Sequence, residues 1–111
     1  MRKLFTFNMV TLLKTLLRME GYQVATVLDK KGNLLDNIRH AHPDILLIDI
    51  FLGDKNGLDV VRQIRLLPEL NELKIIMVSG IDMREESLAA GATAFLLKPY
   101  MPDKLFEILR S

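Results

Sequence analysis

The chain contains 111 residues, of which 50% are hydrophobic and 26% are charged, a balance typical of one compact soluble domain. It has no cysteine, which excludes thiolate chemistry, and a domain of this length folds without disulfides or a structural metal. A net charge of +1 does not supply the positive field with which proteins grip phosphate backbones, so direct nucleic-acid binding is not expected. We expect residues 1–111 to form a single domain.

No stretch of the sequence is long and apolar enough to cross a bilayer. The longest nearly apolar segment covers residues 45–52, and Asp49 interrupts it. The amino-terminal residues imitate a signal peptide, but Asn8, Thr11 and Lys14 interrupt its apolar region and no small-residue cleavage site follows. The expected location is the cytoplasm, and no membrane partner is expected.

Apolar residues switch repeatedly between continuous runs and helical spacing, which is typical of β and α elements around a buried parallel sheet. The second run contains Gln23 and Thr26 and is expected at a sheet edge, whereas four consecutive aliphatic residues place the third run at the centre. The predicted strands cover residues 3–7, 22–27, 44–49, 75–78 and 94–97. Their alternation with helices predicts an α/β fold with helices on both faces of the sheet.

Five helical segments alternate with these strands. Each has apolar residues three or four positions apart, together with residue types that favour helix ends. The first helix is expected between Val10 and Gly21, and the second over residues 33–41. The third is expected to begin after an Asn56 cap and to end before Pro68, and the fourth to begin at an Asp82–Glu85 capping box and to end at Gly91. The last is expected to begin at Pro102.

Polar residues follow three of the buried strands, where chemistry is located in open parallel sheets. Asp49 ends the third predicted strand, Ser79 follows the fourth and Lys98 follows the fifth. Each has an ordinary structural interpretation, as a solvated or loop-capping carboxylate, a hydroxyl that satisfies the backbone, and an exposed lysine at the rim. Together, a carboxylate, a hydroxyl and an ammonium group can accept a phosphoryl group and hold two of its oxygens.

The same segments resemble a known family in order and spacing, over nearly the whole chain. The matching stretches are PDILLIDIFL at 43–52, NGL at 56–58, IIMVSG at 75–80, GA at 91–92 and FLLKPY at 95–100. They resemble the receiver domain of two-component response regulators. The resemblance implies a flavodoxin-like, doubly wound three-layer sandwich whose five-stranded parallel sheet has the order 2-1-3-4-5. It also implies a signalling protein of a phosphorelay rather than an enzyme.

The resemblance implies a role for each strand-end residue. Asp49 would accept a phosphoryl group from a histidine kinase or a phosphotransfer protein, while Ser79 and Lys98 would bind phosphoryl oxygens. Ser79 and Phe95 would form a conformational switch, and a plain core position for Phe95 is an equal alternative. The Lys98–Pro99 bond corresponds to a cis peptide of the family, and Gly57 corresponds to a loop glycine for which we expect a positive φ.

The family also binds Mg²⁺, and here the sequence departs from its pattern. Asp49 and the backbone carbonyl of Phe51 correspond to two ligands, but two acidic residues normally follow the first strand. This chain has Asn8 and Met9 there, and no acidic residue precedes Glu20. We also expect this loop to be several residues shorter than in the family. We expect weak Mg²⁺ binding, because one carboxylate holds a hard divalent ion poorly.

Three functions stay open. The leading one is a phosphorylatable receiver whose downstream partner is a separate protein or a fused output domain, with a homodimer as a further expectation. Its contacts are expected on the fourth helix, fifth strand and last helix, around Phe95, with Tyr100 and Met101 near the rim.

The second is a degenerate receiver that binds proteins without phosphorylation, which the missing acidic pair favours. The third is a small aspartyl-phosphate phosphatase, which usually needs a second carboxylate where this chain has Phe51.

Overall fold

The computed structural model describes residues 2–7, 9–26 and 34–111. Their centre is a sheet of five parallel strands in the order β2-β1-β3-β6-β7. These strands are β1 (Lys3–Thr6), β2 (Gln23–Thr26), β3 (Ile45–Asp49), β6 (Lys74–Ser79) and β7 (Ala94–Leu97). The order equals 2-1-3-4-5 when only the strands of this sheet are counted, which confirms the predicted topology and the edge position of the second strand.

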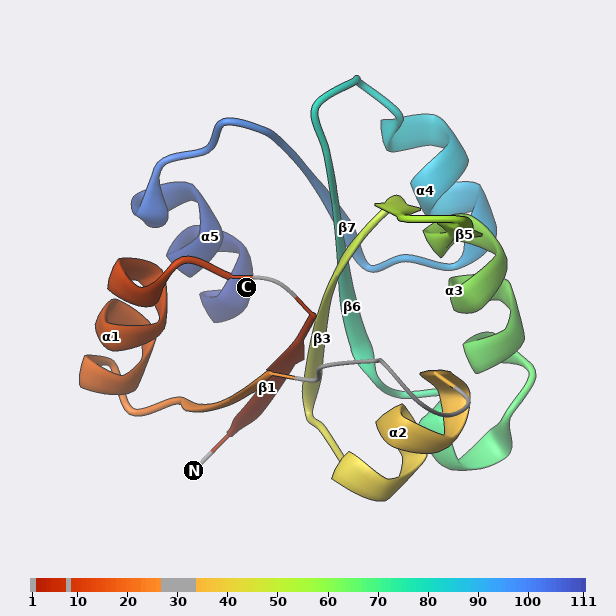
Figure 1. Cartoon of the computed structure of the whole chain (residues 1–111), viewed down its shortest axis with the longest axis horizontal. Coiled ribbons are helices and arrows are strands. Elements are labelled where there is room, and N and C mark those ends of the chain that lie inside the picture. Colours follow the sequence, from red (N-terminus) through yellow and green to blue (C-terminus); the bar gives the residue numbers. More distant parts are fainter. Residues whose placement is uncertain (1, 8, 27–33) are drawn as a thin grey trace.

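Helices cover both faces of the sheet and complete the predicted three-layer sandwich (Figure 1). One face carries α1 (Thr11–Met19) and α5 (Pro102–Arg110), and the other carries α2 (Leu34–Ala41), α3 (Gly57–Arg65) and α4 (Arg84–Ala90). None of the described helices is long and apolar enough to span a bilayer.

The central strand β3 divides its side chains between two hydrophobic cores. Leu46 and Ile48 pack on the side of α2, α3 and α4, whereas Ile45 and Leu47 pack on the side of α1 and α5. All four are at most 4% exposed. Successive side chains of a strand point to opposite faces, so a strand covered on both sides needs an unbroken aliphatic run. Asp49 lies where this run reaches the edge of the sheet.

Three short elements were not predicted. An antiparallel pair, β4 (Phe51–Leu52) and β5 (Lys55–Asn56), follows the central strand, and a single 3₁₀ turn, η1 (Pro68–Leu70), follows α3. Gly53 lies in the turn of the antiparallel pair with φ 62°. Two-residue strands carry no hydrophobic alternation, so the sequence pattern could not reveal them.

The predicted helix ends were partly right. The Asn56 side chain caps α3 by accepting a hydrogen bond from the Leu58 N–H at 2.8 Å, as predicted. The capping box at Asp82 was wrong, because α4 has Met83 at its N-cap and the Asp82 carboxylate instead accepts from the Arg84 N–H at 3.2 Å. An Asp before a helix forms such a local turn as readily as a cap. Residues 27 and 33, at the ends of two predicted elements, lie outside the described residues.

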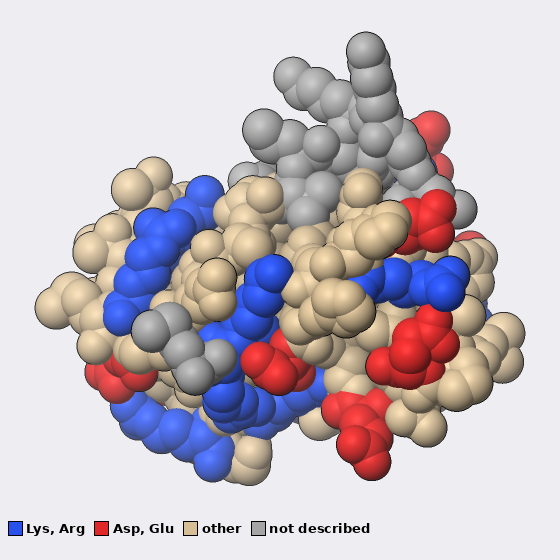
Figure 2. All heavy atoms as spheres, turned by 90° about the horizontal axis from the view of Figure 1, so that it is seen from below, with Lys and Arg blue, Asp and Glu red and all other residues tan. Residues whose placement is uncertain are grey.

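Lysine and arginine side chains gather over the amino-terminal ends of the strands (Figure 2). Lys3 Nζ donates to the Ala41 carbonyl at 2.6 Å, and Lys74 Nζ donates to the Ile108 carbonyl at 2.7 Å. Burial, together with the charge of Arg2, lowers the pKa of Lys74. These cations satisfy carbonyl groups at the carboxyl ends of α2 and α5 and oppose the helix dipoles, so their role is structural.

Candidate functional site

Three polar side chains lie at the carboxyl edge of the sheet, on neighbouring strands. Asp49 is the last residue of β3, Ser79 is the last residue of β6, and Lys98 directly follows β7. In the parallel ladder Asp49 is paired with Val78 and Ser79 with Leu97, and the Lys98 N–H donates to the Ser79 carbonyl at 2.8 Å. The register of the sheet therefore brings the three predicted residues to one edge.

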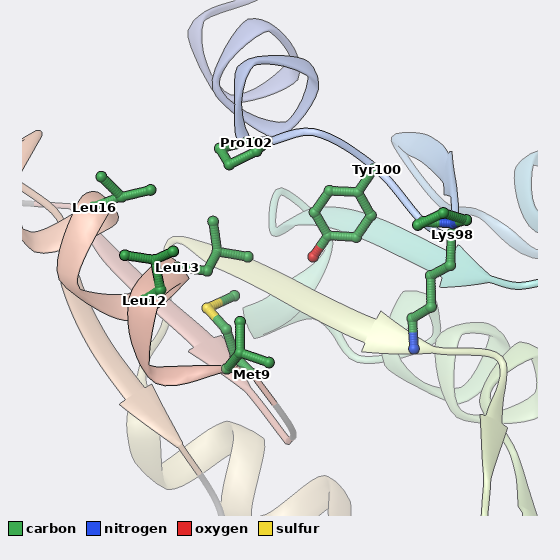
Figure 3. A pocket seen from close by; sticks show the side chains of 9 residues that line it. Met9, Leu12, Leu13, Leu16, Lys98, Tyr100 and Pro102 are labelled. Carbon is green, nitrogen blue, oxygen red and sulfur yellow. The ribbon is translucent and has the colours of Figure 1, made fainter.

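Asp49 and Lys98 form an ion pair across this edge. Lys98 Nζ lies 2.5 Å from Asp49 Oδ1, and the Asp49 side chain is 20% exposed. Figure 3 shows the Lys98 side chain extending from its loop toward the end of β3. The pair compensates a carboxylate that is mostly withdrawn from water.

Ser79 is buried, and its hydroxyl oxygen accepts a hydrogen bond from the Ile81 N–H at 3.0 Å. This bond is the backbone-satisfying role that we expect of a serine at a strand end. A hydroxyl that accepts one hydrogen bond keeps its own proton to donate. Ser79 can therefore still donate to a negatively charged group bound at Asp49.

Gly57 supports the backbone of the site, but not through a positive φ. The residue opens α3, its N–H donates to the Ile50 carbonyl at 2.6 Å, and the positive φ in this region belongs to Gly53. A Cβ at position 57 would collide with the Asp49 carbonyl oxygen. The expectation of a positive φ was wrong, and the physical reason for glycine is the close approach of α3 to the end of β3.

Phe95 belongs to the core rather than to the surface. It is 2% exposed and packs in the core beneath α2, α3 and α4, with the Arg84 guanidinium 5.7 Å from the centre of its ring. This distance is typical of a cation–π contact. The aromatic ring that the resemblance assigns to a switch is thus turned inward and covered by an arginine.

An apolar groove adjoins the ion pair between α1 and the segment that connects β7 to α5. Its volume is about 580 Å³. This groove, called the α1 groove below, is lined by Met9, Val10, Leu12, Leu13 and Leu16 on one side and by Lys98, Pro99, Tyr100 and Pro102 on the other. The Lys98–Pro99 peptide bond in its wall is cis. Tyr100 therefore lies across the groove from residues of α1, whereas we had expected it near the rim of the contact surface formed by α4, β7 and α5 around Phe95.

Tyr100 is the residue of this region that sequence reasoning did not assign to the site. It is half-buried, and Figure 3 shows its hydroxyl directed into the α1 groove. Burial, followed by the negative charge of Asp49, raises the pKa of its hydroxyl. A sequence signal for the groove is the set of apolar residues at positions 9, 12, 13 and 16. Together they make the apolar face of the first helix wider than the stripe that packing on the sheet alone requires.

The residues of the site do not fit a tightly held Mg²⁺ ion. Asp49 is already paired with Lys98, and Phe51, whose carbonyl would be the second ligand, opens β4 with its side chain exposed. Among residues 2–7, 9–26 and 34–111, no group of three His, Cys, Asp or Glu side chains is placed to share a metal ion. Met9 lines the α1 groove, and Asn8 lies outside the described residues. A soft thioether is a poor ligand for a hard cation.

Comparison with known proteins matches residues 7–110 to the response regulator receiver domain family. The chemotaxis protein CheY of Thermotoga maritima is 29% identical over 101 residues, which cover 88% of this chain and 82% of CheY. The polar-differentiation response regulator DivK of Brucella ovis is 30% identical over 104 residues, which cover 90% of this chain and 83% of DivK. The response regulator PleD of Caulobacter vibrioides is 31% identical over 92% of this chain, which spans only 23% of PleD.

Solved structures agree with this assignment. Chemotaxis response regulator CheY4 of Vibrio cholerae has a TM-score of 0.84 at 24% identity, over 99% of this chain and 97% of CheY4, which shows a common fold. The receiver domain of sensor histidine kinase PA1611 from Pseudomonas aeruginosa has a TM-score of 0.77 at 25% identity, over 98% and 94% of the two chains. That domain holds a magnesium ion in its active site cleft. The chain described here belongs to the response regulator receiver domain family of two-component signalling.

Proposed function

We propose that this receiver accepts a phosphoryl group on Asp49 from a histidine kinase or a phosphotransfer protein, and that the phosphorylated form changes its protein contacts. The observation that carries the proposal is the Asp49–Lys98 ion pair at the carboxyl edge, with Ser79 at the end of the next strand. A carboxylate held near an ammonium and a hydroxyl is suited to nucleophilic attack on phosphorus and to the charge that follows.

In the proposed step, a carboxylate oxygen of Asp49 attacks the phosphorus atom of a phosphohistidine. A P–O bond forms as the P–N bond breaks, and its electron pair returns to the imidazole nitrogen of the donor. Lys98 Nζ lies 2.5 Å from the carboxylate and is therefore close enough to interact with the negatively charged phosphoryl oxygens once they are attached to Asp49. The Ser79 hydroxyl, whose oxygen accepts a hydrogen bond from the Ile81 N–H, would donate its own proton to a phosphoryl oxygen.

We propose that this chain binds Mg²⁺ weakly, although the receiver domain of PA1611 holds it in the cleft. Asp49 and the Phe51 carbonyl offer one charged ligand, and the charge of that ligand is already balanced by Lys98. Lys98 is then the main positive charge that faces the phosphoryl group. Phosphorylation should consequently be slow and nearly independent of Mg²⁺.

The partners follow from the same assignment. We infer an upstream phosphodonor and a downstream protein or fused output domain that binds α4, β7 and α5, where Leu88 and Leu97 are exposed. A homodimer, a cytoplasmic location, a single domain over residues 1–111 and the lack of a direct nucleic-acid partner remain predictions. The phosphatase alternative is last, because Phe51 stands where such enzymes need a second carboxylate.

A phosphorylation-independent receiver is the second candidate, and one observation favours it. The chain has Asn8 and Met9 where the family pattern has two acidic residues, and no acidic residue precedes Glu20. A receiver without these carboxylates loses charge neutralisation for phosphoryl transfer and can still bind proteins through its surface. The two candidates differ in whether Asp49 reacts and whether its reaction changes binding.

Intact-mass spectrometry after treatment with acetyl phosphate separates them. The proposed receiver gains the mass of one phosphoryl group, and Asp49→Asn, which keeps the side-chain volume, does not. An unchanged mass for the parent chain after prolonged treatment would overturn phosphorylation and leave the phosphorylation-independent receiver. A mass gain that persists in Asp49→Asn would show that another residue reacts.

A further inference from the structure

The Asp49–Lys98 pair places one negative and one positive charge, which balance each other, at the carboxyl edge of the sheet. Lys98 Nζ lies 2.5 Å from Asp49 Oδ1, and no described residue bonds the second oxygen of the carboxylate. The described residues that line the neighbouring α1 groove include no Asp or Glu. Figure 3 shows aliphatic side chains and the Met9 thioether on that side, and the Lys98 ammonium at the end of β3. The mostly buried carboxylate thus has an ammonium as its counter-charge.

The sequence departs from the family pattern in charge as well as in ligands. Two acidic residues after the first strand would add two negative charges beside Asp49, which is the charge that one divalent cation offsets. This chain has Asn8 and Met9 at those positions. Because Asp49 and Lys98 together are already neutral, a divalent ion would bring excess positive charge to a position with little access to water.

Lys98 also competes with a metal for the same carboxylate. A hard divalent ion binds a carboxylate oxygen directly, and the Lys98 ammonium already lies 2.5 Å from one oxygen of Asp49. Two cations on one carboxylate repel each other, and further carboxylates would be needed to offset that repulsion. Missing ligands explain why a metal would bind weakly, whereas the ammonium explains how Asp49 keeps its negative charge without a metal.

We propose that Lys98 is the resident cation of this site and excludes divalent ions from Asp49. The loss of the acidic pair and the loss of the metal are then one change, because Lys98 neutralises the carboxylate that remains. Removing the ammonium should uncover a divalent-cation site at the Asp49 carboxylate and the Phe51 carbonyl. The exclusion follows from the ion pair and the ligand set, and its consequence for phosphoryl transfer rests on the proposed function.

Titration with Mn²⁺ tests the exclusion, because carboxylate and carbonyl oxygens bind this paramagnetic ion as they bind Mg²⁺. Electron paramagnetic resonance measures free Mn²⁺, and line broadening in amide NMR spectra locates the bound ion. We expect a dissociation constant above about 10 mM for the parent chain. Lys98→Met keeps a long unbranched side chain without the charge. It should bind Mn²⁺ about tenfold more tightly, with broadening centred on Asp49 and Phe51.

Three variants serve as controls. Lys104→Met also removes one lysine from a lysine–carboxylate pair, since Lys104 Nζ lies 3.9 Å from the Glu107 carboxylate on the exposed face of α5. It matches Lys98→Met in overall charge and should bind Mn²⁺ as the parent does. Lys98→Arg keeps the positive charge and should bind no more tightly than the parent. Asp49→Asn, added to Lys98→Met, should abolish the gain in affinity.

Two results of the titration would overturn the inference. Binding of Mn²⁺ to the parent chain below about 1 mM, with broadening at Asp49, would show that the ion and the Lys98 ammonium coexist. Equal affinities of Lys98→Met and Lys104→Met, in chains whose NMR spectra show the parent fold, would show that Lys98 does not exclude the ion.

A second experiment tests the consequence for phosphoryl transfer. Labelling of Lys98→Met by acetyl phosphate should become at least about threefold faster in millimolar Mg²⁺ than in EDTA, whereas labelling of the parent should not change. Equal labelling of Lys98→Met in both conditions would contradict the replacement of a metal by Lys98 in the reaction. If the parent chain is not labelled at all, the proposed function fails, and the Mn²⁺ titration, which uses no phosphodonor, still decides whether Lys98 excludes the ion.

Discussion

The ammonium of Lys98 lies 2.5 Å from the carboxylate of Asp49, and the two residues come from different strands of the sheet, since Asp49 ends β3 and Lys98 directly follows β7. The pair brings a positive charge to a carboxylate that is mostly buried at the carboxyl edge of the sheet. Because Lys98 remains half-exposed, the pair is expected to contribute more to the chemistry of Asp49 than to folding.

Replacing Lys98 by alanine should therefore slow the phosphorylation of Asp49 while changing the free energy of unfolding only slightly. We expect the rate of Asp49 phosphorylation by acetyl phosphate to fall roughly 10- to 100-fold, since one preorganised charge is lost. The free energy of unfolding should change by no more than about 1 kcal/mol. Time-resolved intact-mass spectrometry and urea denaturation measure the two effects. Lys104→Ala, an exposed lysine of α5, is the control, and a parental rate for Lys98→Ala would contradict the prediction.

Mg²⁺ should have little effect on phosphorylation of the unmodified chain. The site offers the Asp49 carboxylate, whereas two further carboxylates would be needed after β1, where the sequence has Asn8 and Met9. Labelling by acetyl phosphate in millimolar Mg²⁺ should equal labelling in EDTA. Asn8→Asp should restore part of a metal dependence, and reinserting an acidic pair with added loop residues should restore more. Rapid and strongly Mg²⁺-dependent labelling of the parent chain would refute this view of the site.

Gly57→Ala should destabilise the fold around Asp49. The added Cβ collides with the Asp49 carbonyl oxygen, which is backbone and cannot swing away. We expect a loss of about 1 to 3 kcal/mol in the free energy of unfolding, as for other overpacked positions. Gly80→Ala is the matched control, because a Cβ there meets nothing within 4 Å. Coinciding urea denaturation curves for the two variants would contradict this prediction, because they would show that α3 can move away from Asp49 without lowering the free energy of unfolding.

The raised pKa of Tyr100 predicts a loss of stability at alkaline pH. Its hydroxyl releases a proton less readily in the folded chain than in the unfolded chain, whose tyrosine has the ordinary value of 10.0. Above that pH the unfolded state has fewer bound protons than the folded state, so the free energy of unfolding falls as pH rises. Tyr100→Phe should remove this component of the pH dependence. An absorbance titration of Tyr22→Phe, in which Tyr100 is the remaining tyrosine, measures the pKa directly.

The sequence by itself determined the α/β architecture and the identity of three residues at the carboxyl edge. Strands buried on both faces need unbroken aliphatic runs, so β3 and the polar residue that ends it, Asp49, are visible without a structure. The same holds for Ser79 and Lys98, which end or follow the next two strands. A strand end is a local property of the sequence, and parallel strands place all such ends at one edge.

Tertiary structure alone decided how these residues are used. The pairing of Lys98 with Asp49 joins segments far apart in the chain, and the Cβ collision at Gly57 depends on how the β4–β5 pair returns the chain to the end of β3. No local pattern encodes these distances. The burial of Phe95 beneath Arg84 is of the same kind. The α1 groove exists because the loop after β7 passes beside α1, which turns a half-exposed Tyr100 toward apolar residues that periodicity had assigned to the core. Periodicity identifies which side chains leave water, whereas packing decides which of them meet.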